Sequence, residues 1–148
     1  MTLYQHILLA VDFFEQDNVV VNRALDLAAG CQARLSLIHV VDSLPIVDTG
    51  LGMDIPYPLD LADELTEVAK SRLAHLANRL GVAESDTWLV TGSPKLEIIR
   101  IANEQRVDLI VLGSHGRHGL ALLLGSTANS ILHHAQCDVL AVRLPNTD

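Results

Sequence analysis

Short apolar segments alternate with segments of helical periodicity along the whole chain, and this alternation restricts the fold more than any other feature of the sequence. A short, nearly continuous apolar run is typical of a strand that is covered on both faces. Strands separated by helices form parallel sheets through right-handed crossovers. The strand-like segments are Ile7–Val11, Leu35–Val41, Asp86–Thr91, Leu109–Leu112 and Val139–Val142.

The predicted fold class is therefore α/β, a five-stranded parallel, doubly wound, Rossmann-like three-layer sandwich. With the first strand in the centre, the expected strand order is 3-2-1-4-5. Ligands in such sheets bind at the carboxyl ends of the strands, near the point where the strand order reverses.

Four helices are expected between the strands. Apolar residues at helical spacing predict the first over 21–28, with Gly30 as its end, and a long second helix over 61–80, closed by Gly81. Ser93 followed by Pro94 is typical of a helix start, and Leu96, Ile99 and Ala102 are the expected buried face of that third helix. The last helix is expected over 124–135. The segment 42–58, rich in proline and glycine, is predicted to be a loop.

Composition supports one domain, residues 1–148, in a soluble protein. The chain has 148 residues, of which 49% are apolar, enough for one substantial core. A net charge of −8 argues against nucleic acid and anionic membranes as general partners. No apolar run approaches the ~18 residues of a membrane span, so no membrane insertion is expected. The start of the chain lacks the basic region of a signal peptide, and the two distant cysteines fit a reducing cytoplasm.

The segment most informative about chemistry follows the fourth strand. It runs Gly113-Ser114-His115-Gly116-Arg117 and continues to Gly125-Ser126-Thr127, where the last helix begins. Glycines allow backbone N–H groups to approach a ligand closely, and a helix N-terminus adds unpaired N–H donors and a positive dipole end. No Asp or Glu occurs between Leu109 and Cys137. This combination favours a phosphate group.

Other readings of the same segment have less support. It has no lysine for a Walker A loop, and its Gly-x-x-Gly-x-x-Gly spacing differs from the dinucleotide motif. Its histidines lack an acid or cysteine that would complete a zinc site, so no metal site is predicted. No nucleophile elbow surrounds Ser114 or Ser126, so no catalytic residue is assigned. A flexible glycine turn without a ligand stays an alternative.

Several segments together resemble the universal stress protein family, along essentially the whole chain. The run Gly-Ser-His-Gly-Arg directly after a buried strand is the most specific of them. The matching segments are Ile7–Asp12, His39–Asp42, Val107–Arg117, Gly125–Ser126 and Cys137–Arg143.

The resemblance implies a cytoplasmic dimer that, in many members, binds ATP. The family motif is Gly, two residues, Gly, nine residues, Gly, then Ser or Thr. By similarity, the loop from Gly113 through His115, Gly116 and Arg117, together with Gly125, Ser126 and Thr127, would hold the phosphates. Asp12 and Val40 match positions that line the ribose and adenine, and Ala10 and Leu112 lie nearby in the pattern.

Two departures from the family pattern bear on this site. Eight residues, not nine, separate Gly116 from Gly125, and Phe13-Phe14 follows Asp12 where many ATP-binding members have Gly-Ser. Two single residues also have alternative roles. Asp12 would accept a hydrogen bond from a ribose hydroxyl or hold Mg²⁺ through water, or it would cap the following loop. Arg117 would pair with phosphate or be solvated.

The leading hypothesis is a cytoplasmic stress-response protein, not an enzyme, with ATP or a related adenine nucleotide, with or without Mg²⁺, as regulatory ligand. The alternatives are a dimeric interaction protein without nucleotide and a slow ATPase. A homodimer is predicted through the last strand, Asp138–Arg143, because a strand at the sheet edge has unpaired backbone groups and this one contains no lysine or proline.

Overall fold

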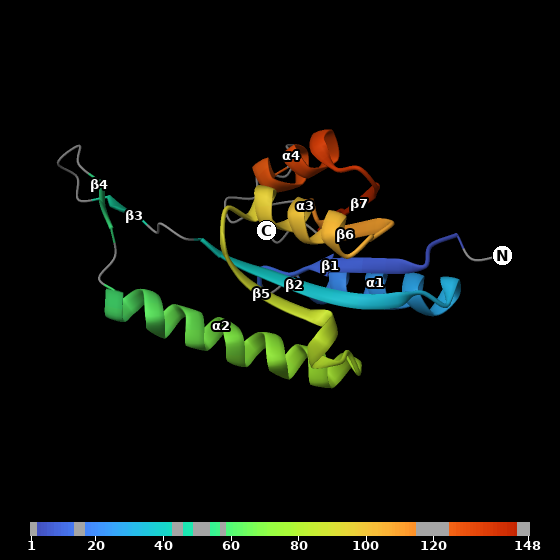
Figure 1. Ribbon diagram of the computed structural model, residues 1–148, viewed down its shortest axis with the longest axis horizontal. Helices are drawn as coiled ribbons and strands as arrows, with labels where there is room; N and C mark the ends of the chain where they lie inside the picture. The colour runs from blue at the N-terminus through green and yellow to red at the C-terminus, as the bar shows by residue number, and fades with distance from the viewer. Residues whose placement is uncertain are drawn as a thin grey trace.

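A parallel sheet forms the centre of the molecule, with strand order β5-β2-β1-β6-β7 (Figure 1). The computed structural model describes residues 3–13, 17–42, 46–48, 54–56, 59–114 and 125–144. Counted along the chain, the order of the five sheet strands is 3-2-1-4-5, as predicted. The strands are β1 (His6–Ala10), β2 (Arg34–Asp42), β5 (Thr87–Gly92), β6 (Leu109–Gly113) and β7 (Asp138–Val142).

Helices cover both faces of this sheet, which confirms the three-layer sandwich (Figure 1). One face packs against α1 and α2, and the other packs against α3 and α4. The central strands are therefore covered by helices on both faces. Ile7, Leu8 and Leu9 of β1 have no exposed surface. The helices are α1 (Asp17–Cys31), α2 (Leu59–Leu80), α3 (Pro94–Glu104) and α4 (Ser126–His134).

The segment predicted to be a loop contains two short strands, so the prediction is wrong there. Strands β3 (Ile46–Asp48) and β4 (Asp54–Pro56) pair antiparallel. β-Branched side chains at 46, 47 and 55 favour extended backbone. A two-stranded ladder consists only of edge strands, where a proline is tolerated, as at Pro56.

The buried faces of two helices also differ from the predictions. In α3 the buried residues are Ile98, Ile101 and Ala102, whereas Leu96 is 67% exposed. In α2 the predicted apolar stripe is buried only toward the carboxyl end of the helix, since Leu65 is 45% exposed. The first turns of α2 reach beyond the sheet, so they have no sheet face to pack against (Figure 1).

The ends of the helices follow the sequence signals unevenly. Gly81 closes α2 in the left-handed conformation, as predicted, with a φ of 71°. By contrast α1 continues past Gly30 to Cys31, and Gln32 takes the left-handed position with a φ of 54°. Ser93 precedes α3 as its N-cap residue, with Pro94 at the first helical position.

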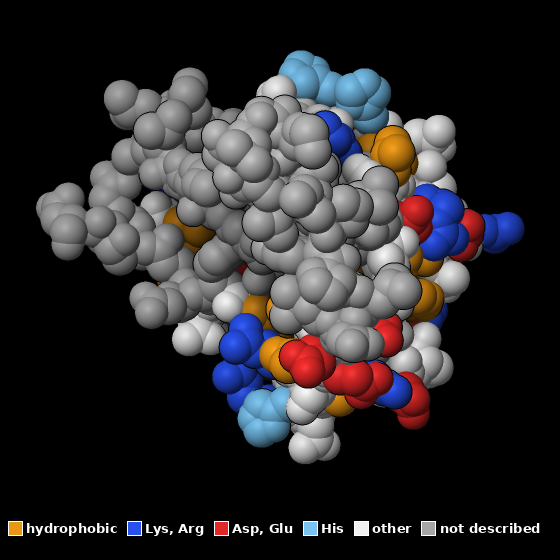
Figure 2. Space-filling model, turned by 90° about the vertical axis from the view of Figure 1, so that its left-hand side faces the viewer, with side chains coloured by type: hydrophobic (Ala, Val, Ile, Leu, Met, Phe, Trp, Pro, Cys, Tyr) orange, Lys and Arg blue, Asp and Glu red, His pale blue; other side chains and the backbone are white. Residues whose placement is uncertain are grey.

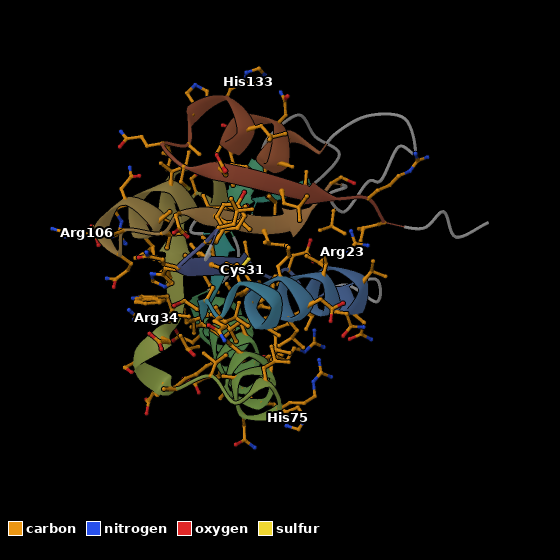
Figure 3. The ribbon with its side chains drawn as sticks, turned by 90° about the vertical axis from the view of Figure 1, so that its right-hand side faces the viewer. Arg23, Cys31, Arg34, His75, Arg106 and His133 are labelled. Carbon is orange, nitrogen blue, oxygen red and sulfur yellow. The ribbon has the colours of Figure 1, made fainter. Side chains whose placement is uncertain are left out.

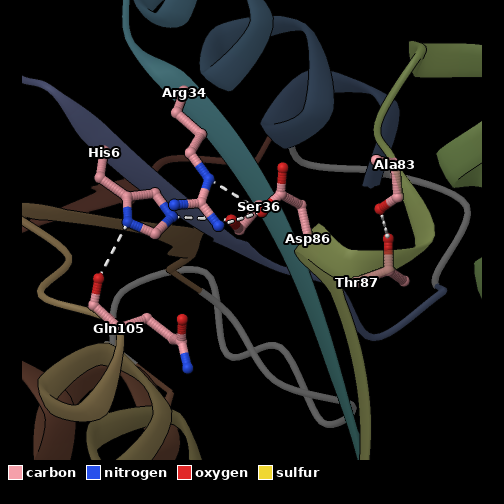
Figure 4. Close-up of polar contacts among 7 residues, drawn as sticks. All are labelled: His6, Arg34, Ser36, Ala83, Asp86, Thr87 and Gln105. Atoms are coloured by element: carbon pink, nitrogen blue, oxygen red, sulfur yellow. Dashed lines mark hydrogen bonds and ion pairs between the residues drawn. The ribbon is translucent and has the colours of Figure 1, made fainter.

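A buried histidine joins three elements at the amino-end edge of the sheet (Figure 4). His6 Nδ1 donates to the Gln105 carbonyl at 3.1 Å, because a carbonyl only accepts, and Nε2 therefore accepts from the Ser36 hydroxyl at 2.7 Å. The backbone N–H of His6 donates to the Asp108 carboxylate at 3.0 Å. An ion pair between Arg34 and Asp86 lies beside this group (Figure 4).

We expect His6 to make the protein less stable in mild acid. Burial, followed by the charge of Arg34, lowers the pKa of His6 below its ordinary value, against the opposing charges of Asp86 and Asp108. The unfolded chain then takes up a proton more readily than the folded one, so stability is full above pH ~6.5 and falls as the pH drops below it. Urea unfolding of the parent between pH 7.5 and 5 should show this loss. The loss should be smaller in His6→Phe, and an equal loss in both would contradict the assignment.

Candidate functional site

The strand order reverses between β1 and β6, and this point defines the candidate site. From β1 the chain moves outward to β2 and β5, and then crosses to β6 and β7 on the other side. Leu9 pairs with Val111, so the carboxyl ends of β1 and β6 lie side by side. Helical crossovers that leave in opposite directions open a crevice at such a point.

Three predicted site residues share one face of the sheet at this edge. Leu112 is buried in the core cluster that α3 and α4 form with the sheet, and Ala10 and Val40 pack half-buried against the same cluster. They come from the adjacent strands β2, β1 and β6. The structure therefore brings these predicted residues together on one apolar face near the carboxyl ends, where Ala10 and Val40 keep exposed area.

Asp12 lies just beyond β1, with its side chain exposed. The preceding residue, Val11, donates its N–H to the Ile38 carbonyl at 3.0 Å, and its own carbonyl accepts from His39 Nδ1 at 2.6 Å. The backbone before Asp12 is thus held to β2 by both of its polar groups. His39 is thus a hydrogen-bonded histidine of the sheet.

The second part of the candidate site lies where β6 meets the beginning of α4. Ser114 donates its N–H to the Val142 carbonyl at 2.8 Å, and its carbonyl accepts from the Gly125 N–H at 2.6 Å. Gly125 is the N-cap residue of α4, and its carbonyl accepts the first hydrogen bond of that helix, from Asn129 at 2.9 Å. These contacts bring the amino end of α4 to the carboxyl end of β6.

These bonds show which backbone N–H groups at the amino end of α4 are used within the described residues. The Gly125 N–H is already used by Ser114, whereas the N–H groups of residues 126–128 have no acceptor within α4. Ser126 is exposed and Thr127 half-buried. At Gly113, an added Cβ would lie 3.4 Å from Leu144 and 3.5 Å from Val20, so this glycine faces the α1 side of the core.

The charge distribution favours an anion at α4. Helix α4 has no acidic residue in its first turn, and its last turn carries His133 and His134. Figure 2 looks onto the side to which the strands' carboxyl ends point, and its largest acidic group lies in the lower half, where α2 lies. A helix N-terminus whose first turn carries no carboxylate keeps its attraction for negative charge.

Three predicted site residues lie in a segment that the structure does not describe, and the histidines of the described residues form no metal-binding cluster. His115, Gly116 and Arg117 lie outside the described residues. Within the described ranges, no group of three His, Cys, Asp or Glu side chains is arranged to hold a metal ion. His75 on α2 and His133 on α4 lie at opposite ends of the molecule (Figure 3).

Two further nucleophilic side chains, those of Ser36 and Cys137, are unsuited to catalysis by their surroundings. Ser36 and His6 have the spacing of a nucleophile and its base, but the Ser36 side chain has no exposed surface for a substrate to reach. Burial, followed by the charge of Asp138, raises the pKa of the Cys137 thiol, which makes it a weaker nucleophile.

Sequence reasoning assigned no role to Phe13, which the structure places next to Asp12 with a φ of 65°. The phenyl ring lies 4.5 Å from the His39 ring, centroid to centroid. A glycine in this position would have signalled a left-handed turn, but a phenylalanine gives no such signal.

Comparisons with known proteins agree with this architecture. The sequence model of the universal stress protein family matches residues 3–143. Universal stress protein A homolog 2 of Coxiella burnetii is 41% identical, over 97% of this chain and 98% of its own length. Universal stress protein UspA from Lactobacillus plantarum is 27% identical with a TM-score of 0.77, over 95% of this chain and 98% of its own.

A third match concerns a protein with a bound ligand. A universal stress protein solved in complex with cAMP is 26% identical with a TM-score of 0.58, and the match covers 94% of this chain and 96% of that one. None of the helices that the structure describes is long and apolar enough to cross a membrane. From the family match over nearly its whole length and the relative at 41% identity, the chain belongs to the universal stress protein family.

Proposed function

We propose that this protein is a regulatory binding protein whose ligand is ATP or a related adenine nucleotide. The phosphates would lie at the N–H groups of residues 126–128, and the base and ribose would lie toward Ala10, Val40 and Asp12. The observation that carries this proposal is the hydrogen bond from Gly125 to the Ser114 carbonyl, which brings a helix N-terminus to the switch point of the sheet.

A related protein supports the class of ligand. The universal stress protein solved with cAMP shares this chain's fold, and cAMP combines an adenine, a ribose and a phosphate. The proposed site offers each of these parts a matching group: an apolar surface for the base, a carboxylate for ribose hydroxyls, and N–H donors for phosphate.

The site is proposed to bind nucleotide without efficient turnover. Phosphoryl transfer needs a positioned base or water-orienting residue beside the phosphates, usually with a metal ion. Asp12 is the one acidic residue among the assigned positions, and it is assigned to the ribose end. Steady release of phosphate from ATP would contradict this part of the proposal and favour the slow ATPase.

Calorimetric titration tests the ligand. We expect saturable binding of ATP, and titrations with ADP, AMP and cAMP, with and without Mg²⁺, rank the related nucleotides. Asp12→Asn should weaken binding about tenfold, because it removes the charge from one hydrogen-bond acceptor. Lack of binding by all four nucleotides would contradict the proposal and favour an interaction protein that acts without nucleotide.

The same proposal includes a homodimer through β7 in the cytoplasm. Strand β7 ends the sheet, and Val139, Leu140 and Ala141 keep part of their surface exposed. Two copies related by a two-fold axis would pair these edges antiparallel. Cys31 and Cys137 are both free thiols, as is usual in a reducing compartment.

A further inference from the structure

The backbone at Phe13 has a conformation that this residue type rarely adopts. Its φ is 65°, in the left-handed region that glycine enters freely and that bulky residues avoid. A side chain remains in such a conformation only when surrounding contacts hold it there. The contacts of Phe13 therefore indicate what the strained backbone accomplishes.

These contacts join the end of β1 to β2. The Phe13 ring lies 4.5 Å from the His39 ring at an interplanar angle of 45°, and it packs against the core cluster on the α1 and α2 side. His39 Nδ1 also donates to the Val11 carbonyl at 2.6 Å. One histidine of β2 thus contacts both neighbours of Asp12.

The arrangement leaves Asp12 exposed between two anchored residues. Asp12 is exposed at the carboxyl edge where the proposed ribose site lies, while His39 contacts the Val11 carbonyl before it and the Phe13 ring after it. A carboxylate on a fixed backbone loses less conformational freedom when it binds a hydroxyl group. A ring that merely filled the core would not require the residue after Asp12 to have a positive φ.

We propose that Phe13 and His39 form a latch that fixes the backbone on both sides of Asp12 and thereby sets the affinity of the site for the ribose of an adenine nucleotide. This inference rests on the proposed function. Phe13 and His39 are positioning residues here, since they act through Asp12. The latch determines how well the site distinguishes a nucleotide with ribose hydroxyls from one without them.

Calorimetry with ATP and 2′,3′-dideoxy-ATP tests the latch, because the second nucleotide lacks both hydroxyls. Phe13→Gly accepts the same φ without the ring, and His39→Leu removes the donor to Val11. Each should weaken ATP binding about tenfold and leave dideoxy-ATP binding nearly unchanged, as expected for one lost hydrogen bond to a charged group. His39→Asn, whose amide can still donate, should retain more of the preference, and His75→Asn on α2 is the matched control.

The outcomes separate this inference from the proposed function. If the parent prefers ATP and both latch variants keep that preference, the latch is overturned and nucleotide binding stands. Equal affinity of the parent for the two nucleotides overturns the latch and the assignment of Asp12 to the ribose, and nucleotide binding stands. If the parent binds neither nucleotide, the proposed function and the latch are both overturned. Loss of thermal stability with an unchanged preference would show that the ring pair is merely structural.

Discussion

Gly125→Val is expected to weaken ATP binding by about a hundredfold or more in a protein that still folds. The branched side chain would occupy space beside the N–H groups of residues 126–128, where the phosphates are proposed to lie. Loss of two charge-assisted hydrogen bonds corresponds to an effect of that size. Gly125 has a φ of −59° and a ψ of 150°, an extended conformation open to any residue, so the backbone tolerates valine.

The measurement is calorimetric titration of the purified variant with ATP, accompanied by circular dichroism. Exchanging glycine for valine at the N-cap costs up to about 1 kcal/mol of stability, which is small enough to leave the fold intact. Gly30→Val is the matched control, since an added Cβ there meets nothing within 4 Å. Parental affinity in a folded Gly125→Val protein would place the phosphates elsewhere.

Two proline substitutions in β7 should have opposite consequences. The Val142 carbonyl accepts from Ser114, just after β6, so the backbone N–H and carbonyl of Val142 point toward β6. The backbone N–H and carbonyl groups of successive strand residues point alternately to opposite sides of the strand. Those of Leu140 therefore also point toward β6, whereas the N–H of Ala141 points to the open edge. Ala141→Pro is expected to give a folded monomer, because it removes a donor only from the proposed pairing between copies.

Leu140→Pro is the contrasting variant and should destabilise the sheet itself. It leaves a β6 carbonyl without its donor, which costs about 1–3 kcal/mol. Analytical ultracentrifugation at micromolar concentration measures the assembly, and urea unfolding measures stability. A parent that sediments as a monomer, or a dimer that survives Ala141→Pro, would rule out an interface through β7.

Most of the sheet could be predicted from local pattern, because a strand that is buried on both faces appears in the sequence as a continuous apolar run. The run Ile7–Val11 shows this best. Its first three residues are fully buried, and β1 pairs with β2 on one side and with β6 on the other. Helix faces were harder to predict. Leu96 and Ile98 belong to different apolar stripes of α3, since residues two apart do not share a helix face, and the position of the helix over the sheet buries the stripe of Ile98.

The candidate site could be predicted in part. The positions of Ala10, Val40 and Leu112 follow once the strand order is known, because equivalent positions on parallel strands share a face. The use of the Gly125 N–H by Ser114 could not be predicted, since it depends on how the end of β6 meets α4. The role of His39 as a bridge to Val11 and Phe13 likewise depends on the pairing of β1 with β2.

The sequence by itself determined the α/β class, because apolar periodicity is a local property of the chain. The strand order followed from the usual doubly wound arrangement of five such strands, and the family followed from the resemblance of several motifs to universal stress proteins. Only the tertiary structure decided that Ser114 uses the Gly125 N–H at α4, which backbone groups of β7 point away from β6, and that a phenylalanine occupies a left-handed position after Asp12. Each of these depends on contacts between segments distant in sequence. Such contacts form only when the sheet assembles, so no local pattern encodes them.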